Sequence, residues 1–417
     1  MVIAISLATC ISYGDSTIPK VSADYINNEI MKAIENGSSV NFTGYIIEGD
    51  LDITRRYIPQ KKISSKIIIA NCQILGKVNF RKWIFEKDFS FFNTSITKEA
   101  SFYSVQFNEA ADFRDTKFLG GANFDKSIFL NRTDFGHAQF NVKSTFQAAQ
   151  FVEVAFFGGA DFDVASNAAK FETTRFEEDA IFGHANFPSG PYFQAATFFK
   201  NASFDYAHFG EESSFRGALF NGIANFDHAK INDTMVLSDI QLADNLNLTY
   251  MQIHRIDIKN VRFNNKSKIF LDESEFDKLV ADWNSIKPHL NYDRNVYSVL
   301  FDNFRKQGDY SSADDCYYEL RANDKLSKNI FLDFVYGYGV KPQKALFACL
   351  ALVAIFGLIY WIFYNSNIIQ AFYLSLLIFV SHFSFDSKIR GGWIYLFLFE
   401  NILSLLFLAF LIASLVR

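Results

Sequence analysis

The chain has 417 residues, a formal net charge of −5 at pH 7 and a hydrophobic share of 50%, and 49 of its residues are phenylalanines. Charges of both signs are mixed along it, which argues against a basic nucleic-acid groove, so we expect no nucleic-acid partner. The four cysteines, Cys10, Cys72, Cys316 and Cys349, have no metal-ligand spacing and indicate no disulfide framework, which fits a reducing compartment.

The first segment, Met1–Tyr13, is apolar but has no basic residue of the kind that precedes the apolar run of a signal peptide. Leu7–Cys10 resembles a lipoprotein cleavage site only faintly, so we favour a buried strand or cap over export. A helix is predicted over Ser22–Asn36, where apolar residues recur at helical spacing before Gly37. Residues 1–40 are therefore assigned to an N-terminal segment that caps the fold.

A ladder of apolar residues, mostly phenylalanines, runs from Phe80 to Ile253. Its steps alternate between five and six residues, so the true period is eleven residues with two apolar positions. One longer step, from Phe157 to Phe171, indicates three residues inserted within Val164–Lys170. Neither a helix nor a simple strand gives this rhythm, whereas a short fixed period is typical of a solenoid.

A small residue stands two positions before most of the ladder residues, as in Ala122-Asn123-Phe124 and Ala224-Asn225-Phe226. This spacing puts the small and the large side chain on the same face of a short strand. Both then point into a narrow core, and we expect the phenylalanines to form that core rather than an aromatic ligand box.

These units resemble the pentapeptide-repeat family, whose motif is a small residue, then Asn or Asp, then Phe or Leu. The resemblance implies an all-β, right-handed quadrilateral β-helix, here with about 22 residues per coil and about eight coils in the ladder. We assign residues 41–262 to this solenoid, with Gly49–Ile53 in its first coil. The resemblance specifies a fold and no activity, and a protein or small ligand on the solenoid is the expected partner.

Residues 263–340 are predicted to form a helical linker. Apolar residues recur at helical spacing over Ser274–His289, Asn291–Lys306 and Tyr310–Leu326. The last two segments are joined at Gly308 and form an αα-hairpin. This hairpin is either a spacer that packs on the solenoid or an element that docks a partner.

The stretch Gly337-Tyr338-Gly339 matches part of a potassium-filter signature, but no span precedes it, so we do not take it as a filter. Pro342, with Lys341 and Lys344, indicates the interfacial start of a membrane helix.

Residues 341–417 are predicted to form a membrane domain. Residues 345–364 and 393–416 are each long and apolar enough to cross a bilayer. Residues 369–380 are also apolar but, at about 12 residues, too short to cross, which suits a re-entrant helix.

The order of span, half-span, irregular loop and span resembles the two-transmembrane potassium-channel-like superfamily. The resemblance implies four subunits around one pore and places the filter on Ser381, His382, Phe383, Ser384, Phe385 and Asp386. Two phenylalanines stand there where the family has glycines, whose backbone angles aim carbonyl oxygens at the ion. The pore is therefore either less selective, with side chains of His382, Ser384 and Asp386 along it, or no longer conducts. His382 is either a pH sensor or a surface residue without that role.

Three polar residues of the second span, Glu400, Asn401 and Ser404, are inner-helix candidates. A carboxylate at membrane depth is costly and is by default a functional hypothesis. Glu400 and Ser404 are one helical turn apart and can face the same seam. Glu400 either lines or gates a pore or makes an interhelical hydrogen bond to the re-entrant segment.

The basic residues that flank the two spans predict the topology. Lys341, Lys344 and Arg417 lie at one side, and Lys388 and Arg390 lie at the other. Two spans place both ends of the domain on the same side. The positive-inside rule then puts the solenoid in the cytoplasm and the chain in the cell membrane as a two-span protein.

We therefore expect an ion-channel-like membrane protein that conducts cations through a tetrameric pore, with the solenoid as a sensor or docking module. The alternative is a non-conducting, membrane-anchored scaffold for protein–protein interaction. The expected partners are the lipid bilayer, further copies of the chain and a permeant cation. The sequence has no nucleophile elbow, phosphate loop or metal cluster, so we expect no enzyme activity, cofactor or metal site.

Overall fold

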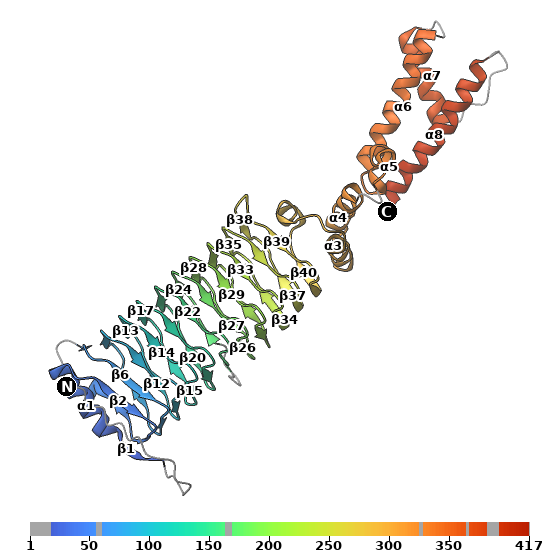
Figure 1. Cartoon of the computed structure of the whole chain (residues 1–417). Coiled ribbons are helices and arrows are strands. Elements are labelled where there is room, and N and C mark those ends of the chain that lie inside the picture. The colour runs from blue at the N-terminus through green and yellow to red at the C-terminus, as the bar shows by residue number, and fades with distance from the viewer. Residues whose placement is uncertain are drawn as a thin grey trace. The chain divides into compact units, whose positions relative to one another are not determined.

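The structure is a computed structural model that describes residues 18–55, 61–162, 169–324, 328–363, 367–381 and 392–416 (Figure 1). Met1–Tyr13 lies outside the described residues, so the expectation for this segment stays untested. The chain divides into two compact units, Met1–Asn291 and Tyr292–Arg417.

The first unit is a β-solenoid of about 11 turns, built from short parallel strands (Figure 1). Successive coils pair in register 22 residues apart, as in the pairs Ala100↔Ala122 and Ala122↔Ser144. Over the described residues, the strands fall into four hydrogen-bonded sheets of 6, 11, 13 and 10 strands. The predicted solenoid is thus confirmed, with more coils than the phenylalanine ladder alone indicates.

The eleven-stranded sheet shows the path of the chain, because each coil contributes one strand to it. Its strands are β2 (Val40–Thr43), β6 (Ile67–Ala70), β10 (Phe89–Ser90), β14 (Ala111–Asp112), β18 (Thr133–Asp134), β22 (Ala155–Phe156), β25 (Ala180–Ile181), β29 (Ala202–Ser203), β33 (Ala224–Asn225), β36 (Leu246–Asn247) and β39 (Ile269–Phe270).

Columns of stacked phenylalanines form the core of the solenoid. Rings one coil apart lie nearly parallel: Phe102 and Phe124 have centroids 4.7 Å apart, and Phe124 and Phe146 have centroids 4.9 Å apart. The ladder phenylalanines and small residues such as Ala122 are buried, as their strand spacing predicts. Because each ring covers the ring before it, burial of aromatic surface stabilises every coil against its neighbours.

One corner in each eleven-residue unit contains a residue in the left-handed region of backbone space. Asn93 has φ of 48°, and the amide of Thr94 donates a hydrogen bond of 3.1 Å to the carbonyl of Phe91. This is a four-residue turn with positive φ at its third position. The same geometry recurs at Ser104 and Asp115, so the eleven-residue unit is the structural repeat.

The expected insertion appears in the strand register. Thr145 of β20 (Ser144–Thr145) pairs with Lys170 of β23 (Ala169–Lys170), which is 25 residues away rather than 22. The additional three residues are therefore confirmed, although residues 163–168 lie outside the described ranges.

Helix α1 (Ala23–Asn36) caps the first coils. The Ser22 side chain accepts a hydrogen bond from the Tyr25 amide, and Gly37 ends the helix with a left-handed backbone. Ile26 and Ile30 are fully buried, and the helix packs on β2 and on β4 (Leu51–Asp52). The predicted helix is confirmed, and it covers the apolar end that the first coil would otherwise expose.

The helix expected over Ser274–His289 is wrong. This segment forms β40 (Glu275–Val280), the short helix α2 (Trp283–Ile286) and a 3₁₀ turn, η2 (Lys287–His289). β40 pairs in parallel with β37 (Gln252–Asp257), so the preceding coil supplies a strand template that overrides the helical spacing. The solenoid consequently continues to Val280, beyond the expected boundary at residue 262.

The second unit begins with an αα-hairpin of α3 (Arg294–Lys306) and α4 (Tyr310–Asn323). Asp293 and Asp309 cap the two helix starts with side-chain hydrogen bonds, and Gly308 makes the turn with φ of 76°. Leu300 and Cys316 are fully buried between the helices. The hairpin predicted around Gly308 is therefore confirmed.

In the described part of the chain, four further helices follow: α5 (Ile330–Tyr336), α6 (Pro342–Phe363), α7 (Ile368–Ser381) and α8 (Trp393–Val416). By length and composition, α6 and α8 are able to cross a membrane, whereas α7 has 14 residues. Between α5 and α6, Gly337–Gly339 forms a 3₁₀ turn, η3. The sequence predicted α6, α7 and α8 but not α5.

Candidate membrane site

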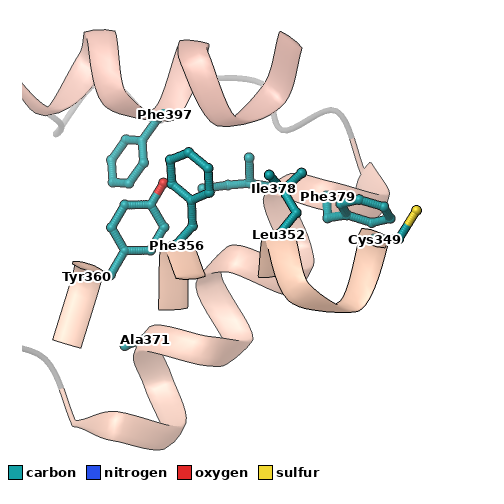
Figure 2. Packing of buried hydrophobic residues seen from close by; sticks show 8 residues of the cluster. All are labelled: Cys349, Leu352, Phe356, Tyr360, Ala371, Ile378, Phe379 and Phe397. Carbon is teal, nitrogen blue, oxygen red and sulfur yellow. The ribbon is translucent and has the colours of Figure 1, made fainter. Parts of the chain in front are cut away.

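The three apolar helices α6, α7 and α8 pack around a small common core, shown in Figure 2. Its buried residues are Cys349, Leu352, Phe356 and Tyr360 of α6, Ala371, Ile378 and Phe379 of α7, and Phe397 of α8. Gly357 of α6 allows the close approach of α7, because a Cβ atom there would lie 2.9 Å from the ring of Phe372. Small residues of this kind and polar bonds hold helices together where the surroundings are apolar.

The carboxylate of Glu400 lies inside this core and is fully buried. The hydroxyl of Tyr360 on α6 donates a hydrogen bond to Oε2, and the hydroxyl of Ser375 on α7 lies 2.5 Å from Oε1. Figure 2 shows the Tyr360 oxygen directed toward the helix that carries Phe397. One acidic side chain of α8 therefore connects all three helices, and each of its oxygens has a partner.

Ser375 also approaches the backbone of α6. Its Oγ atom lies 3.1 Å from the carbonyl oxygen of Val353 and is fully buried. The hydroxyl thus stands between a carbonyl of α6 and the carboxylate of α8. Through these two contacts, Ser375 connects α7 to both of its neighbouring helices.

The other two inner-helix candidates differ in their surroundings. Ser404 is fully buried one turn after Glu400, and within the described ranges its hydroxyl has no hydrogen-bond partner. Asn401 is half-buried. Glu400 and Ser404 therefore share a buried face of α8, from which Asn401 is turned away.

The filter candidates fall at the end of α7. Ser381 is the last residue of this helix. The remaining five candidates, His382, Phe383, Ser384, Phe385 and Asp386, lie outside the described residues. The expected roles of these residues therefore stay predictions.

The sequence reasoning missed Tyr360, Ser375 and Gly357. Tyr360 and Ser375 are isolated hydroxyl groups in apolar segments, and such groups are candidates to pair with a buried carboxylate of a neighbouring helix. The pairing itself depends on which faces of the helices contact each other, and the periodicity of the sequence does not reveal these contacts.

A second polar group, the juxtamembrane cluster, joins the hairpin to the start of α6 and consists of Asp315, Tyr318, Asp333, Lys341 and Lys344. Lys344 Nζ lies 2.5 Å from Asp333 Oδ1 and 2.7 Å from the Tyr318 hydroxyl. Lys341 forms an ion pair with Asp315 of α4. Both lysines also lie over the Tyr318 ring, at 4.7 Å and 5.4 Å from its centroid.

The Asp333 carboxyl shows the electrostatics of this cluster. Partial burial opposes its ionisation, but hydrogen bonds from Lys344 and Tyr318 outweigh that effect and lower its pKa below the ordinary value. Asp333 is therefore held as a carboxylate, and the cluster ties α4, α5 and α6 together with charged groups.

The Gly337-Tyr338-Gly339 turn has a structural role next to this cluster. The Tyr338 hydroxyl lies 3.3 Å from the carbonyl oxygen of Asn329 and receives the Asn329 amide at 3.1 Å. Tyr338 has φ of 56°, and Gly337 ends α5 with a left-handed backbone. The turn thus connects the end of α5 to Asn329, the residue before its first turn, ahead of the start of α6.

Fold and site together define a class of protein: a β-solenoid joined to a helical unit with two helices long and apolar enough to cross a membrane. A family model described as pentapeptide repeats, in nine copies, matches residues 102–142 and 182–230. No curated protein matched the chain. Over the described residues, no group of three or more His, Cys, Asp and Glu side chains is placed to hold a metal ion.

Proposed function

We propose that this chain is a two-span cell-membrane protein that forms a cation-conducting, tetrameric pore, with its solenoid in the cytoplasm as a sensor or docking module. The observation that carries the proposal is α7, a short apolar helix placed between two longer ones and bound to both through Glu400 and Ser375.

The length of α7 supports a re-entrant position. At 1.5 Å per residue, its 14 residues reach about 21 Å, against about 30 Å of hydrocarbon. A membrane anchor needs one spanning helix and no such half-span. Irregular backbone after a half-span is tolerated at membrane depth where it lines a watery path or is buried in protein.

In this proposal Glu400 acts as a positioning residue. Its two oxygens contact hydroxyl groups of α6 and α7 in the same chain, so it holds α7 in place instead of meeting the ion. The segment that follows α7, with Ser384 and Asp386, is then the part that meets the permeant cation.

The solenoid supports the role of a docking module. Its four sheets and parallel coils support the right-handed, four-sided β-helix that we propose for it, and such a fold gives a rigid rod with repeated surface positions. The rings of His184, Tyr206, His228 and Tyr250 stack along its surface with centroids 5.0, 4.6 and 4.6 Å apart. Tyr206 and Tyr250 are about half exposed, and we propose this stack as the surface that a protein or small ligand meets.

The test is ion flux from liposomes that contain the purified full chain, with potassium, sodium and chloride compared. We expect cation flux that falls in Asp386→Asn, and that changes in Glu400→Gln because α7 loosens. Ile402→Leu, a change on the exposed side of α8, is the control. Absence of flux for every ion, from folded and tetrameric protein, would refute conduction.

One observation favours a second candidate, a non-conducting membrane-anchored scaffold. Because both Glu400 oxygens have partners within the chain, this residue is explained by helix packing alone. The two candidates differ in the flux experiment, and a scaffold also requires that a bound protein be lost when the solenoid surface is changed.

A further inference from the structure

Helix α5 (Ile330–Tyr336) has an apolar face that no other described residue covers. Ile330, Phe331 and Phe334 are 78%, 54% and 69% exposed. They lie on one side of the helix, since residues three and four apart share a face. Val335, at the edge of this face, is buried. On the opposite side, Tyr336 stacks on Phe410 of α8 with ring centroids 4.6 Å apart.

The exposed face of α5 carries no charge. Asp333 is the one charged residue within this helix, and its carboxylate is bound by Lys344 and Tyr318. A soluble surface would rarely leave an isoleucine and two phenylalanines together in water. The one charged side chain of α5 is bound within the protein, and its apolar side chains are exposed. This arrangement is typical of a surface that contacts lipid.

The position of α5 fits this environment. The helix packs against α6 and α8, the two candidate spans. Exposed apolar residues of α6 begin one turn after its start, at Leu346 and Phe347, which are 49% and 69% exposed. The apolar side chains of α5 therefore continue the exposed apolar surface of α6 at the level where this helix begins.

We infer that α5 is an interfacial helix whose Ile330, Phe331 and Phe334 side chains insert among lipid acyl chains at the headgroup boundary. The inference rests on the proposed membrane insertion of α6 and α8. Seven residues are too few to cross a bilayer, and a short helix with one apolar face lies in the interface plane. Tyr336, the last residue of α5, and Tyr338, two residues later, match the aromatic residues enriched at this depth.

The test uses nitroxide spin labels on the full chain, with its own cysteines replaced, in phosphatidylcholine vesicles. Labels are placed at Phe331 and Phe334, at Leu350 as the reference for a lipid-exposed position deeper in α6, and at Tyr310 of α4 as the aqueous reference. Leu350 and Tyr310 are 56% and 66% exposed, so the labels have room. Collision with oxygen reports lipid, and collision with a nickel chelate reports water.

We expect the ratio of oxygen collisions to nickel collisions to be several-fold higher for the labels at Phe331 and Phe334 than for the label at Tyr310. The same ratio should place them at a shallower depth in the bilayer than the label at Leu350. If Leu350 lies in lipid but Phe331 and Phe334 collide with nickel as Tyr310 does, the inference is overturned and membrane insertion stands. Spin–spin broadening at Phe331 would show that a second copy covers α5, which also overturns it. An aqueous Leu350 would overturn both the inference and the membrane proposal.

Discussion

The phenol of Tyr360 on α6 donates a hydrogen bond to the carboxylate of Glu400 on α8, 40 residues further along the chain. Both side chains are fully buried, so neither group has water as an alternative partner. The bond joins the two candidate spans directly, and its strength is measurable.

A double-mutant cycle of Tyr360→Phe and Glu400→Gln should give a coupling energy of about 1 kcal/mol, the order found for hydrogen bonds between membrane helices. Thermal or denaturant unfolding in detergent micelles measures it. The control cycle pairs Tyr360→Phe with Ile402→Val, a residue 60% exposed, and should show no coupling. Equal coupling in the two cycles would contradict a specific Tyr360–Glu400 bond.

Two adjacent alanines of the solenoid should respond in opposite ways to the same change. Ala148 is exposed and has φ of 56°, whereas Ala149 is fully buried and is not among the residues with positive φ. Because a non-glycine residue in the left-handed region costs about 1–2 kcal/mol, Ala148→Gly should stabilise the solenoid by up to about 1 kcal/mol.

The matched variant Ala149→Gly should destabilise the solenoid by about 1 kcal/mol, since it removes a buried methyl group and adds backbone freedom. Urea unfolding followed by circular dichroism compares the two proteins. A loss of stability in both variants would mean that the corner at Ala148 is not left-handed.

The ion pair of Asp333 and Lys344 should depend on pH. The pKa of Asp333 is lowered from its ordinary value of 3.8. For a lowered pKa, the stabilisation is fully present above the ordinary value and disappears as pH falls through the lowered one. The melting temperature of the native chain should therefore exceed that of Asp333→Asn at neutral pH, and the difference should shrink below about pH 4. A difference that grows on acidification would contradict this assignment.

The Cys316 thiol should be unreactive in the folded hairpin. Burial, followed by the nearby charges of Glu319 and Asp315, raises its pKa to about 12. Its sulfur contacts the Tyr297 carbonyl at 3.3 Å, and the thiolate is the reactive form. Iodoacetamide at pH 8 should modify Cys316 only after unfolding, whereas an exposed Ser311→Cys thiol nearby should react at once. Equal reaction rates would contradict a packed α3–α4 interface.

The solenoid was predictable because its signal is repeated many times. Each eleven-residue unit repeats a small residue and a phenylalanine, and no helix or simple strand has that period. The same reasoning was wrong at Phe276, Leu279 and Val280, whose spacing also fits a helix. There the edge of the preceding coil decides the structure, and this information is not local to the segment.

The candidate site was predictable only in part. Glu400 was predictable as a candidate because a carboxylate is rare in an apolar segment. Its partners, Tyr360 and Ser375, were not, because they are 40 and 25 residues away in the chain, on other helices. Which face of α6 meets α8 depends on close packing at positions such as Gly357. Helix α5 was missed because its seven residues are too few to show a period, and its role depends on the neighbours that bind Asp333.

The measurement that most directly tests the account is the side of the membrane on which the C-terminus lies. If α7 is re-entrant, the solenoid and the C-terminus share a side, whereas a crossing α7 places them on opposite sides. Single cysteines at Tyr206, at Lys388 and after Arg417 would be treated with a membrane-impermeant maleimide in intact cells that express the full chain. We predict labelling at Lys388 alone, with the other two sites labelled only after lysis. Labelling of the C-terminal site in intact cells, with Tyr206 protected, would contradict the re-entrant helix and with it the proposed pore.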